Sequence, residues 1–378
     1  MKKDSLRQRI WQFIADKPSS ISVMSSIIAI LGGLLIGFLV MLVIDPSRAF
    51  IGLSTILTGF LRQGGRSLGN TVYYSAPLIL TGVSVAFAFR TGLFNIGATG
   101  QLTVGAFAAV YTGIHWTFLG PIHWIVSVLM AMLAGALWGA IPGILKAYRN
   151  VNEVVASIML NYIGMYLVIL MIKSFIYNRE LARALAPAPS AMLPRLSQLI
   201  TTHRSSLNAG ILVALLVVVI THIILNKTTF GYELKSVGFN RDAARYAGMN
   251  EKRNIILAMT ISGAIAGMAG AVMYLIPGRF IAIDATLISE GFTGIAISLL
   301  GLSSPIGVLF AGLFYGALEM GGFFLQITTN FVPQIIEIII AVIIYFSAFA
   351  LFFQKWVAQR IAKHIKQDVE LPEGSELL

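Results

Sequence analysis

The chain has 378 residues, of which 57% are hydrophobic and only 11% are charged, and its formal net charge is +11. Its mean hydropathy of +0.83 is far above that of soluble proteins, so the composition predicts an integral membrane protein. The chain contains no cysteine, which excludes disulfides, thiol catalysis and cysteine metal sites. The basic residues lie in clusters between apolar runs rather than along one soluble face, so we expect no nucleic-acid partner.

The first 20 residues are basic and lead into an apolar run over residues 21–44. This run is too long for the core of a signal peptide and lacks a small-residue cleavage site, so we expect an uncleaved first span. A helix that crosses the hydrocarbon needs roughly 20 apolar residues, and the chain offers about ten such segments, some of them short or broken. The sequence therefore predicts an all-α polytopic membrane protein. The predicted spans are residues 21–44, 71–89, 92–113, 121–141, 154–176, 208–225, 255–276, 287–301, 306–321 and 332–353.

Most of the 27 lysine and arginine residues lie between these spans on the side that carries the N-terminus. Because cytoplasmic loops are enriched in Lys and Arg, we expect both termini in the cytoplasm. The predicted transmembrane domain, residues 21–353, lies between a basic cytoplasmic N-terminus (1–20) and a cytoplasmic tail (354–378). Its two long loops are an extracellular one at 178–207, which contains several prolines, and a polar cytoplasmic one at 226–254.

Residues 48–70 connect the first two predicted spans and carry apolar side chains at helical spacing. This spacing predicts a short amphipathic helix that lies on the outer membrane interface. The apolar positions are Leu53, Ile56, Leu57, Phe60 and Leu61.

The stretch GLFNIGATGQ, residues 92–101, places three glycines and two side-chain amides next to apolar segments. Glycine permits a helix break, and irregular backbone at membrane depth is tolerated where it lines a cavity or is buried in protein. We therefore predict a pore element, with Phe94, Asn95 and Gln101 as candidates for the translocation pathway. The amides either contact substrate or hold the broken helix together; the sequence slightly favours the first role for Asn95 and the second for Gln101.

A third amide, Asn161, lies within the predicted span 154–176. An unpaired amide in hydrocarbon costs several kcal/mol, so Asn161 needs a partner. That partner is either a passing substrate or a neighbouring helix, in which case Asn161 only stabilises the bundle. Asn161 is therefore a further candidate for the pathway.

Five ionisable residues lie near membrane depth: Lys173, Asp284, Glu290, Glu319 and Glu337. Such residues can form proton relays. All five lie close to the ends of the predicted helices, where solvation makes a charge less costly, so a relay is not favoured. Glu290 is instead a candidate for the outer mouth of the pathway.

The cytoplasmic loop reads FGYELKSVGFNRDAARYAGMN over residues 230–250. Asn240 is a good N-cap and Gly248 a good C-terminal stop, so we expect a short helix over 241–247, and Asn250 is placed to cap the next span. The helix is either a solvated connection or a docking element for a groove on a partner protein. Its small-residue face and its basic face consist of Ala243, Ala244 and Ala247, and of Arg241 and Arg245.

Three segments resemble motifs of binding-protein-dependent importer permeases of the branched-chain amino acid, ribose and nucleoside superfamily. GYELKSVGFNRDAARYAG, followed by SGAIAGMAG, is similar to G-x-x-L-R-A-V-G-x-N-x-x-A-A-R-x-A-G and S-G-x-x-A-G-x-A-G. GLFNIGATGQ is similar to F-N-I-G-A-E-G-Q, and GFTGIAISLLGLSSPIG to G-F-x-G-I-A-V-A-L-L-G-x-x-x-P-x-G. A fourth segment, GILKAYRNVNEVVASIMLNYIG (residues 143–164), resembles the signature of the branch that imports nucleosides.

The resemblance implies a permease subunit of an ATP-driven ABC importer that moves nucleosides across the bacterial cytoplasmic membrane by alternating access. It also implies three partners: a cytoplasmic ABC ATPase, a second and non-identical permease subunit, and an extracellular lipid-anchored substrate-binding protein. No lysine in the chain follows a glycine, so no P-loop can be written. ATP and Mg²⁺ would be bound by the partner ATPase, and we expect neither a cofactor nor an enzymatic activity in this chain.

The resemblance further identifies the cytoplasmic loop as the segment that couples the permease to the ATPase. At Thr99 the family pattern has Glu, and we expect the Thr99 hydroxyl to bond back to a carbonyl of its own helix. Sugars such as ribose, or branched-chain amino acids, are alternative substrates. An ion-coupled secondary transporter explains the composition but not the cytoplasmic loop, and a membrane-embedded enzyme would need a catalytic constellation that the sequence does not show. The candidate coupling residues are Gly238, Asn240, Arg241, Ala243, Ala244, Arg245, Ala247 and Gly248.

Overall fold

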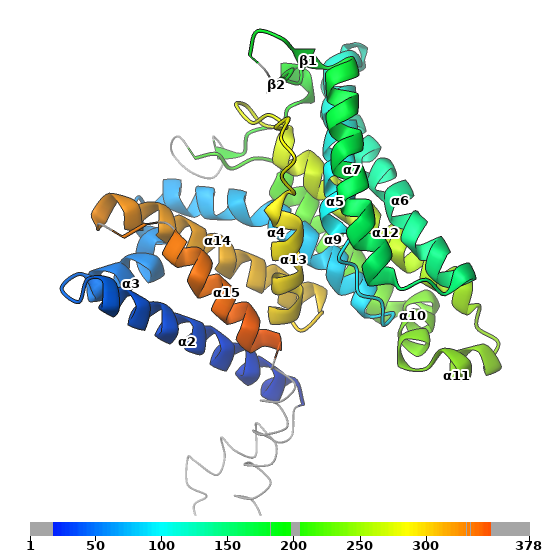
Figure 1. Ribbon diagram of the computed structural model, residues 1–378, viewed down its shortest axis with the longest axis horizontal. Coiled ribbons are helices and arrows are strands. Elements are labelled where there is room, and N and C mark those ends of the chain that lie inside the picture. Colours follow the sequence, from blue (N-terminus) through cyan, green and yellow to red (C-terminus); the bar gives the residue numbers. More distant parts are fainter. Residues whose placement is uncertain (1–17, 182, 198–204, 330, 333, 349–378) are drawn as a thin grey trace, which may run out of the picture. The chain divides into compact units, whose positions relative to one another are not determined.

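The computed structural model describes residues 18–181, 183–197, 205–329, 331–332 and 334–348 (Figure 1). Most of these residues are helical, and two short strands, β1 (Tyr177–Asn178) and β2 (Arg183–Ala184), pair antiparallel. Most of the predicted N-terminal segment 1–20 and all of the predicted tail 354–378 lie outside the described residues.

By its internal contacts the chain divides into two compact units, residues 1–53 with 331–378 and residues 54–330. In the first unit, helix α2 (Pro18–Ile44) packs against helix α15 (Gln334–Ala348). A β-carbon at Gly37 of α2 would overlap the side chain of Ile339 of α15. Small residues let helix backbones approach closely, which is how helices associate in lipid.

The second unit contains the candidate functional site. The sequence predicted one short helix in the cytoplasmic loop 226–254, and the structure has two, α10 (Thr229–Phe239) and α11 (Arg241–Tyr246), between α9 (Gly210–Lys227) and α12 (Glu251–Tyr274). The helices of this unit are α4 (Gly65–Phe89), α5 (Ala98–His115), η2 (Thr117–Ile122), α6 (His123–Arg149), α7 (Glu153–Phe175), η3 (Pro189–Ala191), α9 (Gly210–Lys227), α10 (Thr229–Phe239), α11 (Arg241–Tyr246), α12 (Glu251–Tyr274), α13 (Ser289–Leu300) and α14 (Pro305–Thr328).

The continuous amphipathic helix predicted over residues 48–70 is wrong. Helix α3 (Ala49–Thr58) is followed by the 3-10 turn η1 (Gly59–Leu61), and α4 already begins at Gly65. The apolar spacing continues across the break, but Gly64 has φ +54, a conformation that a helix interior does not use. The pattern of apolar residues therefore predicted helical structure in this region and missed the break within it.

Helix α12 lies against α4, α5 and α6 in the second unit (Figure 1). Its contacts with α5 and α6 are backbone to backbone: a β-carbon at Gly139 of α6 would lie 2.5 Å from the carbonyl oxygen of Met259 and 2.9 Å from the Cα of Gly263. Close contact of this kind requires small residues on both helices. It fixes the position of α12 relative to the helix break that precedes α5.

Seven helices of the described part of the chain are long and apolar enough to cross a membrane. Each of the ten predicted spans contains a helix, but α13 is short, and α5 begins six residues later than predicted position 92 because residues 90–97 are not helical. The prediction of an all-α polytopic membrane protein with some short or broken helices is confirmed, whereas the cytoplasmic location of the termini stays a prediction. The seven are Met24–Ile44, Gly65–Phe89, Thr117–Arg149, Glu153–Phe175, Gly210–Lys227, Glu251–Tyr274 and Pro305–Thr328.

Candidate functional site

The predicted break between α4 and α5 is built around a pair of amides. The Nδ2 of Asn95 donates to the Oε1 of Gln101 at 2.8 Å, and the Nε2 of Gln101 donates back to the Oδ1 of Asn95 at 3.1 Å. The same Nδ2 also donates to the hydroxyl of Ser262 on α12 at 2.7 Å. Asn95 is 0% and Gln101 1% exposed, so both amides are buried and their partners come from the protein.

Asn161 of α7 holds the first turn of α5. Its Oδ1 accepts from the backbone N–H of Gly100 at 2.8 Å, and its Nδ2 donates to the carbonyl of Ile96 at 3.1 Å. The first N–H groups of a helix lack partners within the helix. Asn161 therefore supplies an acceptor to α5 from a neighbouring helix. This agrees with the alternative in which Asn161 stabilises the bundle rather than binding substrate.

Phe94 and Thr99 lie close to these amides in the sequence but do not take part in their hydrogen bonds. Phe94 is half-buried, and its ring centroid lies 4.9 Å from that of Phe89. The hydroxyl of Thr99 is buried and has no hydrogen-bond partner, so the predicted bond back to its own helix is wrong. Thr99 is the second residue of α5, and no helical turn precedes it whose carbonyl could accept.

The predicted cytoplasmic loop contains the short helix that the sequence predicts. Helix α11 begins after Asn240, whose Oδ1 accepts from the backbone N–H of Ala243 at 3.0 Å, and Gly248 ends it with φ +82. Asn250 caps α12 by accepting from the N–H of Arg253 at 3.1 Å. Both caps and the stop are confirmed.

The exposed surface of this segment differs from the predicted alanine face. Ala244 is buried among apolar side chains of α10 and α12, because it turns toward the body of the protein while Ala243 and Ala247 face outward. The predicted docking role of Ala244 is therefore wrong. Two aromatic side chains that the sequence analysis did not select, Phe239 and Tyr246, are each 94% exposed. Phe239 directly precedes the Asn240 cap and Tyr246 is the last residue of α11; an aromatic residue at each end of a short helix in a polar loop was the signal that could have identified them.

The segment made of α10 and α11 touches the break directly. A β-carbon at Gly238 would lie 2.6 Å from the carbonyl oxygen of Arg90 and 3.0 Å from the nitrogen of Gly92. Arg90 in turn donates from its Nε to the carbonyl of Ser303 in the turn between α13 and α14, at 2.9 Å. Burial lowers the pKa of Arg90, but the guanidinium stays charged at neutral pH. A movement of α10 would therefore reach the break and the α13–α14 turn through contacts that already exist.

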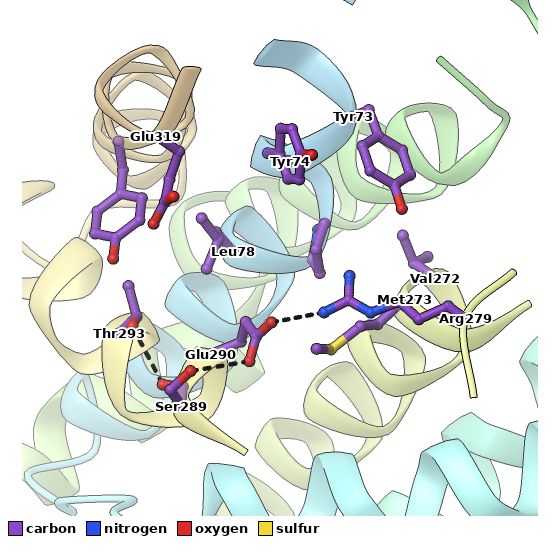
Figure 2. A pocket seen from close by; sticks show the side chains of 12 residues that line it. Tyr73, Tyr74, Leu78, Val272, Met273, Arg279, Ser289, Glu290, Thr293 and Glu319 are labelled. Atoms are coloured by element: carbon purple, nitrogen blue, oxygen red, sulfur yellow. Dashed lines mark hydrogen bonds and ion pairs between the residues drawn. The ribbon is translucent and has the colours of Figure 1, made fainter. Parts of the chain in front are cut away.

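A pocket of about 190 Å³ with a mixed polar and apolar lining lies between α4, α12, α13 and α14 (Figure 2). The Nη2 of Arg279 lies 3.0 Å from the Oε1 of Glu290, and the hydroxyl of Ser289 lies 3.2 Å from the Oε2 of Glu290. Glu319 reaches the pocket from α14 on the other side. The remaining lining residues are aromatic, apolar or hydroxyl-bearing: Tyr73, Tyr74, Pro77, Leu78, Val272, Met273, Thr293 and Tyr315.

The pocket lies at the opposite end of α12 from the α10–α11 segment. Leu275, just after α12, accepts at its carbonyl from the N–H of Leu193 at 2.9 Å, and Leu193 belongs to the predicted extracellular loop 178–207. Of the predicted pathway residues, Glu290 lines the pocket, whereas Phe94, Asn95, Gln101 and Asn161 do not.

The position of Glu319 departs from the prediction. Helix α14 extends to Thr328, nine residues beyond Glu319, so this carboxylate lies inside the helix rather than near its end. The three tyrosines and Glu319 were missed because their proximity depends on the packing of helices that lie far apart in the sequence. Among the described residues, no group of three or more His, Asp or Glu side chains is arranged to hold a metal ion.

Comparison with known proteins finds relatives that align with this chain over most of its length. Residues 67–348 match the family described as branched-chain amino acid transport system / permease component. The guanosine ABC transporter permease protein NupP of Bacillus subtilis is 42% identical over 323 residues, which are 85% of this chain and 92% of NupP. The nucleoside ABC transporter permease protein NupB of Lactococcus lactis is 36% identical, over 86% of this chain and 90% of NupB.

More distant relatives widen the range of transported compounds. The glucose ABC transporter permease protein TsgB13 of Haloferax volcanii is 32% identical, over 90% of each chain. Bacillus subtilis and Lactococcus lactis each contribute a second, less similar permease protein, NupQ and NupC. No solved structure matches the chain significantly.

Proposed function

The chain belongs to the family of branched-chain amino acid transport system permease components, and we propose that it is the transmembrane permease of an ATP-driven importer of nucleosides. The observation that carries this proposal is the 42% identity to the guanosine permease NupP over 85% of the chain. Family membership and the seven apolar helices place the protein in the cytoplasmic membrane as a multi-pass subunit. ATP and Mg²⁺ would be bound by a separate ATPase, since the sequence contains no P-loop.

The α10–α11 segment, with the candidate residues from Gly238 to Gly248 other than the buried Ala244, is proposed as the docking site for that ATPase. Phe239 and Tyr246 project fully into solvent on either side of Asn240. Buried aromatic residues commonly dominate the binding energy of protein interfaces, and Arg245 adds an exposed charge beside them. A groove on the ATPase would receive the two aromatic rings.

We expect the docking movement to pass to the membrane part through Gly238. Because its backbone lies against residues 90–92, a shift of α10 moves the break before α5 and, through Arg90, the turn that joins α13 and α14. A rigid-body shift of packed helices is one of the common ways in which transporters alternate between states.

The predicted pathway residues then have two different roles. Asn95, Gln101 and Asn161 hold the break together, because each is almost fully buried and forms its side-chain hydrogen bonds with other groups of the protein. Glu290 lines the pathway itself, in the pocket between α4, α12, α13 and α14. Phe94, which is half-buried, remains a candidate for contact with substrate.

The proposed importer also contains a second, non-identical permease and an extracellular lipid-anchored binding protein. The second permease is supported by the presence of two related permeases in each of two bacteria. The binding protein would select the ligand, so the permease needs only a passage that accepts it.

The test is uptake of radiolabelled guanosine by the complete importer in proteoliposomes. We expect uptake that requires ATP, persists when the proton gradient is collapsed, and exceeds uptake of glucose or leucine. Uptake that follows the proton gradient and ignores ATP would contradict the proposal. Preferred uptake of glucose would favour the second candidate, a sugar importer, to which the relationship with TsgB13 points.

A further inference from the structure

Helix α13 lies between the pocket and the first turn of α5. Three residues on one face of α13, Ser289, Glu290 and Thr293, line the pocket (Figure 2). Gly291 lies on another face, against α5: a β-carbon at Gly291 would lie 2.5 Å from the Cα of Thr99 and would overlap the Thr99 hydroxyl. The contact of α13 with α5 therefore separates the pocket from the break that precedes α5.

This contact depends on glycine rather than on interlocking side chains. Gly294, one turn after Gly291, lies against α4 in the same way, since a β-carbon at Gly294 would lie 2.6 Å from the Cβ of Thr81. At these two positions α13 has no side chain that would lose dispersion contacts on separation. Residues 275–288, which precede α13, form no helix or strand, so α13 is not a continuation of α12.

The hydroxyl of Thr99 is buried by this contact without gaining a partner. Thr99 is 0% exposed, and its hydroxyl forms no hydrogen bond. A buried polar group without a partner loses the hydrogen bonds that it would make with water. A hydroxyl both donates and accepts, so water or a polar group of the substrate could bond to it once α13 moved away. The closed contact is therefore unfavourable for Thr99 itself.

The turn that follows α13 is strained and is linked to the α10–α11 segment. Leu302 has φ +55 and Ser303 has φ +50, a conformation that is unfavourable for residues with a side chain. The Nε of Arg90 donates to the carbonyl of Ser303 at 2.9 Å, and the backbone of Gly238 lies against Arg90. Strained backbone commonly occurs in switch regions, and here it lies where a movement of α10 would reach α13.

We propose that α13 is the gate of the passage: when α10 moves Arg90, the strained turn relaxes, Gly291 leaves Thr99, and the Thr99 hydroxyl becomes exposed to the passage. This inference rests on the proposed function as an ATP-driven permease. The pocket of about 190 Å³ is smaller than the roughly 300–1,000 Å³ of ordinary ligand pockets. A passage that α13 still closes would have such a small pocket.

The experiment measures whether residue 99 becomes accessible during ATP hydrolysis. The chain contains no cysteine, so Thr99→Cys introduces a single thiol into the permease, and its reaction with N-ethylmaleimide is followed in the complete importer in proteoliposomes. A thiol buried in apolar surroundings is inert, so we expect Thr99→Cys to react about tenfold faster during ATP hydrolysis than without nucleotide.

Ser157→Cys is the matched control. Ser157 is also 0% exposed and has an unpaired hydroxyl, but it belongs to α7 and lies against the break, with its hydroxyl oxygen 3.2 Å from a β-carbon at Gly97. We expect Ser157→Cys to stay unreactive in both conditions. An equally slow reaction of Thr99→Cys with and without ATP, in an importer that hydrolyses ATP, would overturn the proposal. Reaction of Ser157→Cys at the rate of Thr99→Cys would overturn it too, because the break as a whole would then open.

Gly291→Ala is a second variant in case Thr99→Cys does not assemble. Its β-carbon would hold α13 away from α5, and transport by alternating access needs a gate that closes, so we expect guanosine uptake to fall about tenfold while ATP hydrolysis continues. Gly59→Ala is the control, since its β-carbon would lie 2.6 Å from the Cα of Gly321, between η1 and α14. Uptake by Gly291→Ala at the rate of the wild type, or an equal loss in Gly59→Ala, would overturn the proposal.

The two readouts separate the gate from the proposed function. If the wild-type importer takes up no guanosine, the proposed substrate is wrong. The reaction of Thr99→Cys requires only ATP hydrolysis by the importer, so it still decides whether α13 leaves α5. Normal guanosine uptake without any ATP-dependent reaction at residue 99 overturns the gate alone.

Discussion

Replacement of the paired amides before α5 separates a structural role from contact with substrate. In Asn95→Leu, both polar atoms of the Gln101 amide lose their partner, whereas Ser262 keeps its bonds to Ser84. A buried polar group left without a partner costs about 1–3 kcal/mol, so Asn95→Leu should destabilise the protein by about 2–6 kcal/mol. In Gln101→Met, only the Oδ1 of Asn95 is stranded, because its Nδ2 still reaches Ser262, and the expected cost is about 1–3 kcal/mol.

The double variant gives the sharper test. Replacing both members of a hydrogen-bonded pair by apolar groups of similar shape leaves no amide unsatisfied and can be nearly neutral. We therefore expect Asn95→Leu with Gln101→Met to be more stable than Asn95→Leu alone, although it carries one more substitution. Residues in contact commonly show interaction energies of this size, about 0.5–3 kcal/mol.

The assay has two readouts: the midpoint of thermal unfolding of the detergent-solubilised importer, and ATP-dependent guanosine uptake per assembled complex. The expected order of stability is wild type, Gln101→Met, Asn95→Leu, with the double variant above Asn95→Leu. An Asn95→Leu importer that unfolds at the temperature of the wild type but no longer transports guanosine would refute the reasoning, because Asn95 would then act on substrate.

Two further predictions concern the α10–α11 segment. Phe239→Ser combined with Tyr246→Ser should weaken copurification of the ATPase at least tenfold, because two rings that are each 94% exposed would be lost from the proposed interface. The control is Phe118→Ser, which removes an 80% exposed aromatic side chain from η2, the short helix after α5. If the double variant bound the ATPase as well as the Phe118→Ser control, the docking assignment would be contradicted. Gly238→Val should keep the ATPase bound but reduce guanosine uptake at constant ATP hydrolysis, since its side chain would push against the backbone of residues 90–92. The control is Gly248→Asn, which should behave nearly like the wild type because nothing lies within 4 Å of a β-carbon at that position and asparagine tolerates positive φ. If guanosine uptake fell as much in Gly248→Asn as in Gly238→Val, the contact of Gly238 with residues 90–92 would not explain the loss.

The sequence predicted local features of the site well. The N-cap at Asn240, the stop at Gly248 and the cap at Asn250 depend on residues within a few positions of each other, and all three are confirmed. The break at residues 92–97 was predicted for the same reason, since its glycines mark it within one short stretch. Capping and glycine conformations are decided by the local backbone.

Features that depend on tertiary packing could not be read from the same patterns. The burial of Ala244 depends on which face of α11 meets α10 and α12, and small residues suit an interior face as well as an exposed one. The pairing of Asn95 with Gln101 requires the chain to turn between them, and Asn161 comes from another helix. The unpaired hydroxyl of Thr99 follows from the exact start of α5, and helix boundaries are the least predictable part of an element.

The polar groups at membrane depth in this permease are of two kinds. Some hold the helices together and are called the frame here, whereas others line the substrate pathway and are called the passage. The Asn95 and Gln101 amides satisfy each other, so their removal lowers stability and affects transport only through folding. Glu319 is different: its exposed side chain lines the pocket between α4, α12, α13 and α14. Glutamine has nearly the same size as glutamate and keeps hydrogen-bonding atoms, so we expect Glu319→Gln to leave the unfolding midpoint near that of the wild type while guanosine uptake per assembled complex falls. A lowered unfolding midpoint with normal uptake per assembled complex in Asn95→Leu, and an unchanged midpoint with reduced uptake in Glu319→Gln, are the results that assign the first residue to the frame and the second to the passage.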